Sequence, residues 1–259
     1  LWDVFKDLVA KTPNSGCEAT IWRYCDARPA VLEAGEVISA RDAERRVLIL
    51  ENPGLKGQSR TTTSLYAGLQ LVLPGESAPA HRHSQSALRL VIEGDGGYTT
   101  VNGERVPMAP GDFIITPAGC WHDHGNDGGE PVVWLDGLDI PMIGLLDASF
   151  VEHHPDHVQS VTRPSGDSLA RYGSGLLPVN YDASVSSSPL FHYPYARTID
   201  ALNRLRQSGE IDPCHGLKFV FVNPATGGPV IPGIEAFVQG LQANTTTEAY
   251  RATDATVFS

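Results

Sequence analysis

The 259-residue sequence has little positive charge and no long apolar run. Its 19 Lys and Arg residues face 30 Asp and Glu residues, so the formal net charge is −11. Nucleic acids and anionic membranes attract clustered cations, so neither is expected as a partner. No stretch reaches the roughly 20 apolar residues that a bilayer-spanning helix needs. Residues 1–11 carry Asp3, Lys6 and Asp7, so we expect no secretory signal there.

Cysteine is also scarce, with four residues in the whole sequence. They show neither the paired CxxC spacing of a zinc site nor the density of a disulfide-stapled domain. We therefore expect free thiols in a reducing compartment, which favours the cytoplasm. The four are Cys17, Cys25, Cys120 and Cys214.

Short apolar runs separated by turn signals dominate the middle of the chain. Asn102-Gly103 between two such runs is a strong signal for a tight hairpin. Many short strands without intervening helical periods predict an all-β, antiparallel sandwich or barrel. The runs cover residues 47–50, 65–73, 88–92, 98–101, 113–116 and 132–135.

The texture of the sequence predicts four segments. Residues 1–45 are expected to form a helical cover, with apolar residues at helical spacing from Leu1 to Val9. Residues 46–141 form the main β-domain. Residues 142–214 resemble a linker with a helix near 196–206. Residues 215–259 are expected to begin a second β-domain that the chain leaves apparently incomplete.

Two blocks within residues 46–141 bring histidines into a pattern. The first has the spacing G-x5-H-x-H from Gly75 and contains His81 and His83. Residues two apart in a strand face the same side, so both imidazoles can point to one place. The second block, Gly111–Asn126, has the spacing G-x5-P-x-G-x2-H-x3-N and contains His122. An HxH pair alone is usually an ordinary strand feature, but together the blocks resemble the two motifs of the cupin superfamily, a jelly-roll fold.

Cupin metal sites commonly add a glutamate shortly after the second histidine. Ala87 and Leu88 occupy the matching positions, and Glu93 lies too far along the chain. The resemblance therefore implies a three-histidine site with about three open coordination positions. Imidazoles suit Fe(II), Zn, Cu and Ni, so the donor set by itself does not choose the metal.

Longer segments resemble gentisate 1,2-dioxygenase, over most of residues 1–141 and more loosely over 217–259. The resemblance implies a homotetrameric bicupin with one Fe(II) per chain, held by His81, His83 and His122. It also implies ring opening of an ortho-hydroxy aromatic acid with O2 in aromatic hydrocarbon catabolism, here gentisate to maleylpyruvate. Relatives that cleave salicylate or 1-hydroxy-2-naphthoate are not separated by these motifs. The matching segments are residues 44–53, 64–71, 79–89, 121–126 and 134–141.

Four further residues are candidates for substrate binding or catalysis. Arg89, expected on the same strand face as His83, can pair with the substrate carboxylate through its planar fork. Gln70 lies in an apolar run, and the resemblance favours contact with substrate, the alternative being a satisfied core amide. His124 resembles a family residue that hydrogen-bonds substrate or oxygen. Asp136 is expected to bond His124 and orient it.

Several residues are left with open or ordinary roles. Either Arg45 or Arg46 could reach the pocket, and Asp123 is expected at the surface or in a turn. Trp121 and Tyr66 could line an aromatic pocket or fill ordinary core. The histidines His153, His154 and His157 are expected on the linker surface. The alternatives to a dioxygenase are a non-oxidative cupin with Zn or Mn and a module that only binds a small acid.

Overall fold

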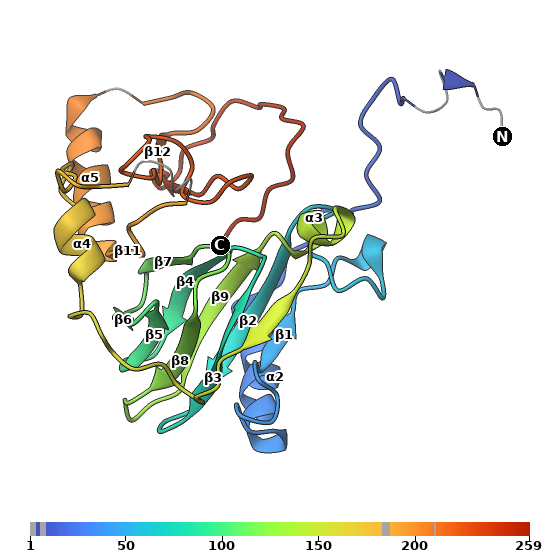
Figure 1. The fold of residues 1–259 in the computed structure, drawn as a ribbon. Coiled ribbons are helices and arrows are strands. Elements are labelled where there is room, and N and C mark those ends of the chain that lie inside the picture. The colour runs from blue at the N-terminus through green and yellow to red at the C-terminus, as the bar shows by residue number, and fades with distance from the viewer. Residues whose placement is uncertain (1–3, 6–8, 183–186, 210) are drawn as a thin grey trace.

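Two antiparallel sheets face each other in the computed structural model, which describes residues 4–5, 9–182, 187–209 and 211–259 (Figure 1). The six-stranded sheet has the order β1-β2-β9-β4-β7-β11, and the five-stranded sheet has the order β10-β3-β8-β5-β6. The first sheet comprises β1 (Val47–Ile49), β2 (Tyr66–Val72), β9 (Val132–Leu138), β4 (Ala87–Glu93), β7 (Phe113–Thr116) and β11 (His192–Tyr193). The second comprises β10 (Val151–His153), β3 (Ser77–His83), β8 (His122–Asn126), β5 (Gly97–Val101) and β6 (Glu104–Met108).

Side chains that alternate along the strands fill the space between the sheets. One apolar cluster includes Val72, Val91, Ile114 and Trp134, each almost fully buried. Burial of each such side chain contributes about 1.5–3 kcal/mol, so this cluster holds the two sheets together. The polar residues of the candidate site share the same interior. The sequence prediction of an antiparallel β-fold is therefore confirmed.

The predicted hairpin joins β5 and β6. Asn102 and Gly103 both adopt positive φ, 45° and 77°, as a type I′ turn requires. Asn102 also binds the segment that leads into β8, since its Oδ1 accepts from the Trp121 amide at 2.9 Å and its Nδ2 donates to the Cys120 thiol. The hairpin thus fixes the position of the segment that precedes β8.

Helix α2 (Tyr24–Val37) covers the outer face of the six-stranded sheet beside β1 and β2 (Figure 1). Val31 packs there with Leu69 and Leu71, which point away from the interior. The helix expected from Leu1 to Val9 falls partly on residues outside the described part of the chain. Its described apolar residues Val4, Phe5 and Val9 are exposed, so they cover no core.

The linker contributes more structure than its sequence predicts. It supplies β10 to the edge of the five-stranded sheet and β11 to the edge of the six-stranded sheet. The helices after β9 are α3 (Ile140–Leu145), α4 (Asp167–Tyr172) and α5 (Tyr195–Ser208), and a 3-10 turn, η1, lies at Pro53–Leu55. The expected helix near 196–206 is confirmed as α5.

The C-terminal segment forms the hairpin β12 (Leu217–Val220) and β13 (Phe237–Gly240). It packs against the outer face of β7, where Phe221 stacks on Phe113 with ring centroids 4.4 Å apart. Ile231 and Ile234 fill the same apolar cluster. The division into a first and a second cupin stays a prediction. Among the described residues, no helix has the length and apolarity needed to cross a membrane.

Candidate active site

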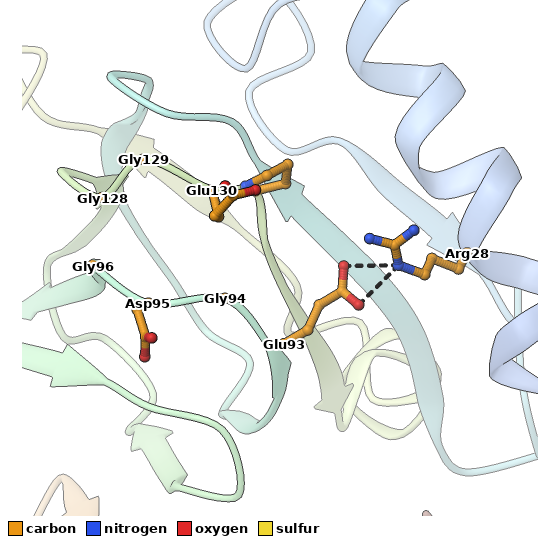
Figure 2. A pocket seen from close by; sticks show the side chains of 9 residues that line it. Arg28, Glu93, Gly94, Asp95, Gly96, Gly128, Gly129 and Glu130 are labelled. Atoms are coloured by element: carbon orange, nitrogen blue, oxygen red, sulfur yellow. Dashed lines mark hydrogen bonds and ion pairs between the residues drawn. The ribbon is translucent and has the colours of Figure 1, made fainter.

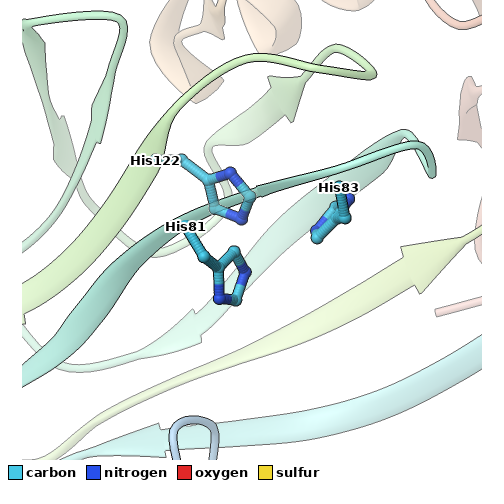
Figure 3. Close-up of side chains that lie close together, drawn as sticks. All are labelled: His81, His83 and His122. Carbon is cyan, nitrogen blue, oxygen red and sulfur yellow. The ribbon is translucent and has the colours of Figure 1, made fainter. Parts of the chain in front are cut away.

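Three histidines converge in the interior between the sheets (Figure 3). His81 and His83 lie on β3, and antiparallel pairing with β8 places His122 opposite His81. One ring nitrogen from each lies within 4.8 Å of the others. The convergence expected from the sequence is therefore present, because the two-residue period of β3 and the β3–β8 register act together.

Backbone carbonyls orient two of these imidazoles. His83 Nδ1 lies 2.8 Å from Gln85 O, and His122 Nδ1 lies 3.0 Å from Cys120 O. A carbonyl only accepts, so Nδ1 carries the proton and Nε2 keeps its lone pair. Such second contacts fix the ring and the tautomer of metal-binding histidines.

The electrostatic surroundings keep the three imidazoles neutral. Burial, followed by the nearby charge of Arg45, lowers the pKa of His81 to about 2 and that of His122 well below its usual range. Burial and the charge of Arg89 also lower the pKa of His83. Metals bind neutral imidazole, so this donor set fits a metal ion such as Fe(II).

Arg45 and Arg46, which the sequence does not distinguish, have different partners. Arg45 Nη2 lies 3.4 Å from His81 Nε2, and Nη1 donates to Pro79 O at 3.1 Å. Burial, with the charge of Arg89 next, lowers the Arg45 pKa to about 10. Arg46 instead forms an ion pair with Glu76 at the turn between β2 and β3. Arg45 is therefore the one beside the histidines.

Arg89 is buried next to Asp136, its direct neighbour in the pairing of β4 with β9. Arg89 Nε lies 3.2 Å from Asp136 Oδ1, and Nη1 donates to Thr116 Oγ1 at 2.7 Å. Burial raises the pKa of Asp136, which the charge of Arg89 opposes. The expectation that Arg89 shares a strand face with His83 is wrong, because a turn sends the two residues into opposite sheets.

His124 faces the interior two residues beyond His122. Its Nε2 lies 3.4 Å from Arg89 Nη2, while its Nδ1 has no hydrogen-bond partner among the described residues. The expected bond from Asp136 to His124 is wrong, since Arg89 contacts both of them. Burial and the charge of Arg89 lower the His124 pKa well below its usual range. A neutral ring that accepts at Nε2 carries its proton on Nδ1, where a ligand can accept it.

Gln70 on β2 is 2% exposed. Its Nε2 has no hydrogen-bond partner within the described part of the chain. A buried donor left unpaired costs about 1–3 kcal/mol, so such a group is commonly completed by water or a ligand. Its role toward substrate stays a prediction, as do the roles of the other candidate residues.

The structure also places the residues whose roles the sequence left open or ordinary. Asp123 is not at the surface as expected but 1% exposed, because linker residue Gln159 covers it. Trp121 lies outside the interior, under the Arg82 guanidinium at 4.8 Å. Tyr66, on β2, is half-buried near Asp136, and burial together with the charge of that carboxylate raises the pKa of Tyr66. His153 and His157 are exposed, as expected of linker surface, whereas His154 is half-buried in edge-to-face contact with Trp121.

A pocket of about 370 Å³ lies elsewhere, at the glycine-rich turns around Gly94 and Gly128 (Figure 2). The Arg28 guanidinium lines this pocket and forms an ion pair with Glu93, with Nε 2.8 Å from Oε2. None of the candidate site residues lines this pocket. The histidine cluster, with its neutral donors and two cations, is therefore the better candidate.

Comparison with known proteins places this geometry in a family. The cupin domain family matches residues 68–138. Gentisate 1,2 dioxygenase 1 of Aquipseudomonas alcaligenes is 54% identical over 259 residues, all of this chain and 75% of the relative. The 5-aminosalicylate 1,2-dioxygenase of Comamonas sp is 37% identical over 99% of this chain and 69% of its own length.

A solved structure agrees with the sequence comparison. The salicylate 1,2-dioxygenase of Pseudoaminobacter salicylatoxidans, crystallised as an adduct with gentisate, superposes with a TM-score of 0.82 at 36% identity. The match covers 90% of this chain and 66% of that one, so the chain spans roughly two thirds to three quarters of these relatives. The cupin fold and the family inferred from the motifs are confirmed. The chain belongs to the gentisate 1,2-dioxygenase family of cupin ring-cleaving dioxygenases.

Proposed function

We propose that this chain is an Fe(II)-dependent dioxygenase that opens the ring of an ortho-hydroxy aromatic acid. The preferred reaction is gentisate plus O2 to maleylpyruvate. The observation that carries the proposal is the convergence of three neutral imidazoles beside two guanidinium groups, those of half-buried Arg45 and buried Arg89. A metal site next to cations matches a substrate that is both a chelator and an anion.

One Fe(II) per chain would be held by His81, His83 and His122. When bound, Fe(II) would supply the redox chemistry that lets O2 react with an aromatic ring. The chain's own contribution is to keep the three donors neutral and pointed at one place. Because two of the Nδ1 protons are already engaged by carbonyls, little reorientation is needed on metal binding.

The remaining site residues would bind and orient the acid. Arg45 and Arg89 offer positive charge to the substrate carboxylate in a poorly solvated interior, where such pairing is strong. Gln70 Nε2 and His124 Nδ1 are donors without partners among the described residues, so they can bind substrate oxygens. Asp136 would hold Arg89 in place rather than touch substrate.

Related acids are the main alternative substrates. One relative is named for 1-hydroxy-2-naphthoate and the solved structure above for salicylate. The polar groups of the site would accept any ortho-hydroxy carboxylate. The shape of the pocket would then decide which ring substituents are tolerated. We further propose that the enzyme works as a homotetramer and that it works in the cytoplasm. Its free cysteines support the second proposal, because thiols stay reduced in that compartment.

Oxygen uptake tests the proposal directly. We expect the Fe(II)-loaded protein to consume O2 with gentisate faster than with salicylate or 1-hydroxy-2-naphthoate, forming a ring-opened product. His83→Ala should lose both iron and uptake, whereas His157→Ala, at an exposed position, should keep both. Iron binding without uptake on any of the three acids would favour a non-oxidative cupin. Absence of stoichiometric metal in the parent protein would favour a module that only binds a small acid.

A further inference from the structure

Residues 150–163 of the linker, called the strap here, run along the outside of the five-stranded sheet toward α4 (Figure 1). The strap begins as β10, which pairs with β3 and places His153 opposite His81. It continues beside β3, since Ala80 N donates to His157 O at 2.8 Å. It ends on the β5–β6 hairpin, where Thr162 N donates to Gly103 O at 3.0 Å. The strap therefore contacts both β3 and the β5–β6 hairpin of this sheet.

Asp123 connects the strap to the second ligand strand. It lies between His122 and His124 on β8, so its side chain points to the opposite face of the sheet. Its Oδ2 accepts from the backbone N of Gln159 at 2.8 Å and from Gln159 Nε2 at 3.2 Å. The strap covers it so fully that 1% of the residue is exposed.

Gln159 is itself held on both sides. Its Nε2 also donates to Thr100 O on β5 at 3.0 Å, and its Oε1 accepts from Gly103 N at 3.3 Å. The side chain thus links β8, β5 and the hairpin in one network. A buried carboxylate needs such donors, because leaving it without hydrogen bonds is costly. Asp123 cannot move without breaking the contacts to Gln159.

We propose that Gln159 is a positioning residue for the metal centre, acting through Asp123 on His122 and His124. The strap supports both ligand strands, β3 by backbone pairing and β8 by the Asp123–Gln159 contact. The linker therefore helps to set the distance between the His81–His83 pair and His122. This inference rests on the proposed metal centre and adds to it a residue that lies outside the barrel interior.

The test compares Gln159→Met, which keeps the length of the side chain, with Gln207→Met on the exposed face of α5. Co(II) is titrated into each metal-free full chain well below its unfolding temperature, with the visible d–d spectrum as the readout. We expect Gln159→Met to weaken Co(II) binding about 10-fold and to alter the spectrum. Loss of a contact that supports metal ligands from outside typically has an effect of this size. Gln207→Met should match the parent.

A double-mutant cycle shows whether Asp123 transmits the effect. On an Asp123→Asn background, Gln159→Met should weaken Co(II) binding less than it does alone, because the buried charge that it serves is gone. Parent-like affinity and spectrum for Gln159→Met would overturn the inference, even with a lowered unfolding temperature. Full additivity in the cycle would remove Asp123 as the connection. If the parent itself binds no Co(II), the proposed metal centre fails and the inference fails with it.

Discussion

The two arginines of the site are held by different kinds of group. Arg89 has an ion pair with Asp136 and a hydrogen bond to Thr116. Arg45 donates to backbone carbonyls, and within the described residues no carboxylate lies at ion-pair distance from it. Its charge is therefore less compensated than that of Arg89. A substrate carboxylate would gain more from Arg45, while Arg89 has a structural share as well.

Substitution of the two arginines should separate these contributions. We expect Arg45→Ala to raise KM for gentisate at least about 10-fold with little loss of stability, since ion pairs to a bound anion are worth a few kcal/mol. Arg89→Ala leaves Asp136 buried without its counter-charge, which typically costs about 3–5 kcal/mol. Oxygen-uptake kinetics and urea unfolding measure the two effects. Equal stability losses in both variants would contradict this division.

At the level of single residues, sequence periodicity predicts faces but not partners. The convergence of His81, His83 and His122 could be predicted. It follows from the alternation of side chains along β3 and from the resemblance of the second histidine block to a cupin motif. The pairing of Asp136 with Arg89 could not be predicted from periodicity, because only the folded sheet places β9 beside β4. The choice of Arg45 over Arg46 depends on which residue the chain turns inward just before β1 begins, and neither hydropathy nor charge encodes that.

At the level of elements, the turn before β7 holds the linker as well as the barrel. Asp112, next to the motif glycine Gly111, accepts from His192 Nε2 at 2.9 Å and from the Tyr195 backbone N at 2.8 Å. The first contact fixes β11, and the second fixes the start of α5. One carboxylate thus attaches two elements of the linker to the six-stranded sheet.

This attachment should depend on pH. Burial alone would raise the pKa of Asp112, but hydrogen bonds from His192 and Tyr195 hold it below its ordinary value of 3.8. A carboxyl whose pKa is lower in the folded state stabilises the protein above the unfolded pKa, and this contribution is lost as pH falls through the folded pKa. Asp112→Asn should therefore lower the free energy of unfolding more near about pH 6 than near about pH 3.

Urea unfolding of the parent and Asp112→Asn at both pH values checks the expectation. Asp95→Asn, in a glycine-rich turn away from the linker, serves as the matched control. A difference between parent and Asp112→Asn that is the same at both pH values would show that the carboxylate charge is not involved.

The linker strands show where prediction from sequence stops at this level. The longer runs of the barrel are visible because apolar and β-branched residues repeat over four or more positions. β10 and β11 have three and two residues, too few for any period to appear. They become strands because β3 and β7 offer unpaired edges, so tertiary context rather than local sequence decides them.

At the level of the whole molecule, the C-terminal segment uses the six-stranded sheet as its base. The outer face of β7 carries Phe113 and Ile115, and Ile231 and Ile234 cover them. This cluster lies on the opposite side of the sheet from the polar interior. Its packing should therefore contribute to stability without taking part in metal binding.

Truncation of one buried isoleucine tests that separation. Ile231 is 1% exposed, so Ile231→Ala should lower the free energy of unfolding by about 2–5 kcal/mol. Ile211→Ala, at a residue that is 48% exposed, should change it little. Co(II) affinity of folded Ile231→Ala should equal that of the parent. A large loss of affinity would mean that the outer cluster and the metal centre are coupled.

The pairing of β10 with β3 also bears on how the chain avoids self-association. Without β10, the strand that carries His81 and His83 would be the open edge of its sheet, with free amides and carbonyls that a second chain could pair with. Before a metal is bound, such an edge would be a ready template for intermolecular β-pairing. β10 occupies it with a short strand that contains the charged Glu152, bonded to Arg82. The same linker segment that packs against β3 and β8 thereby leaves no open edge at β3 with which a second chain could pair.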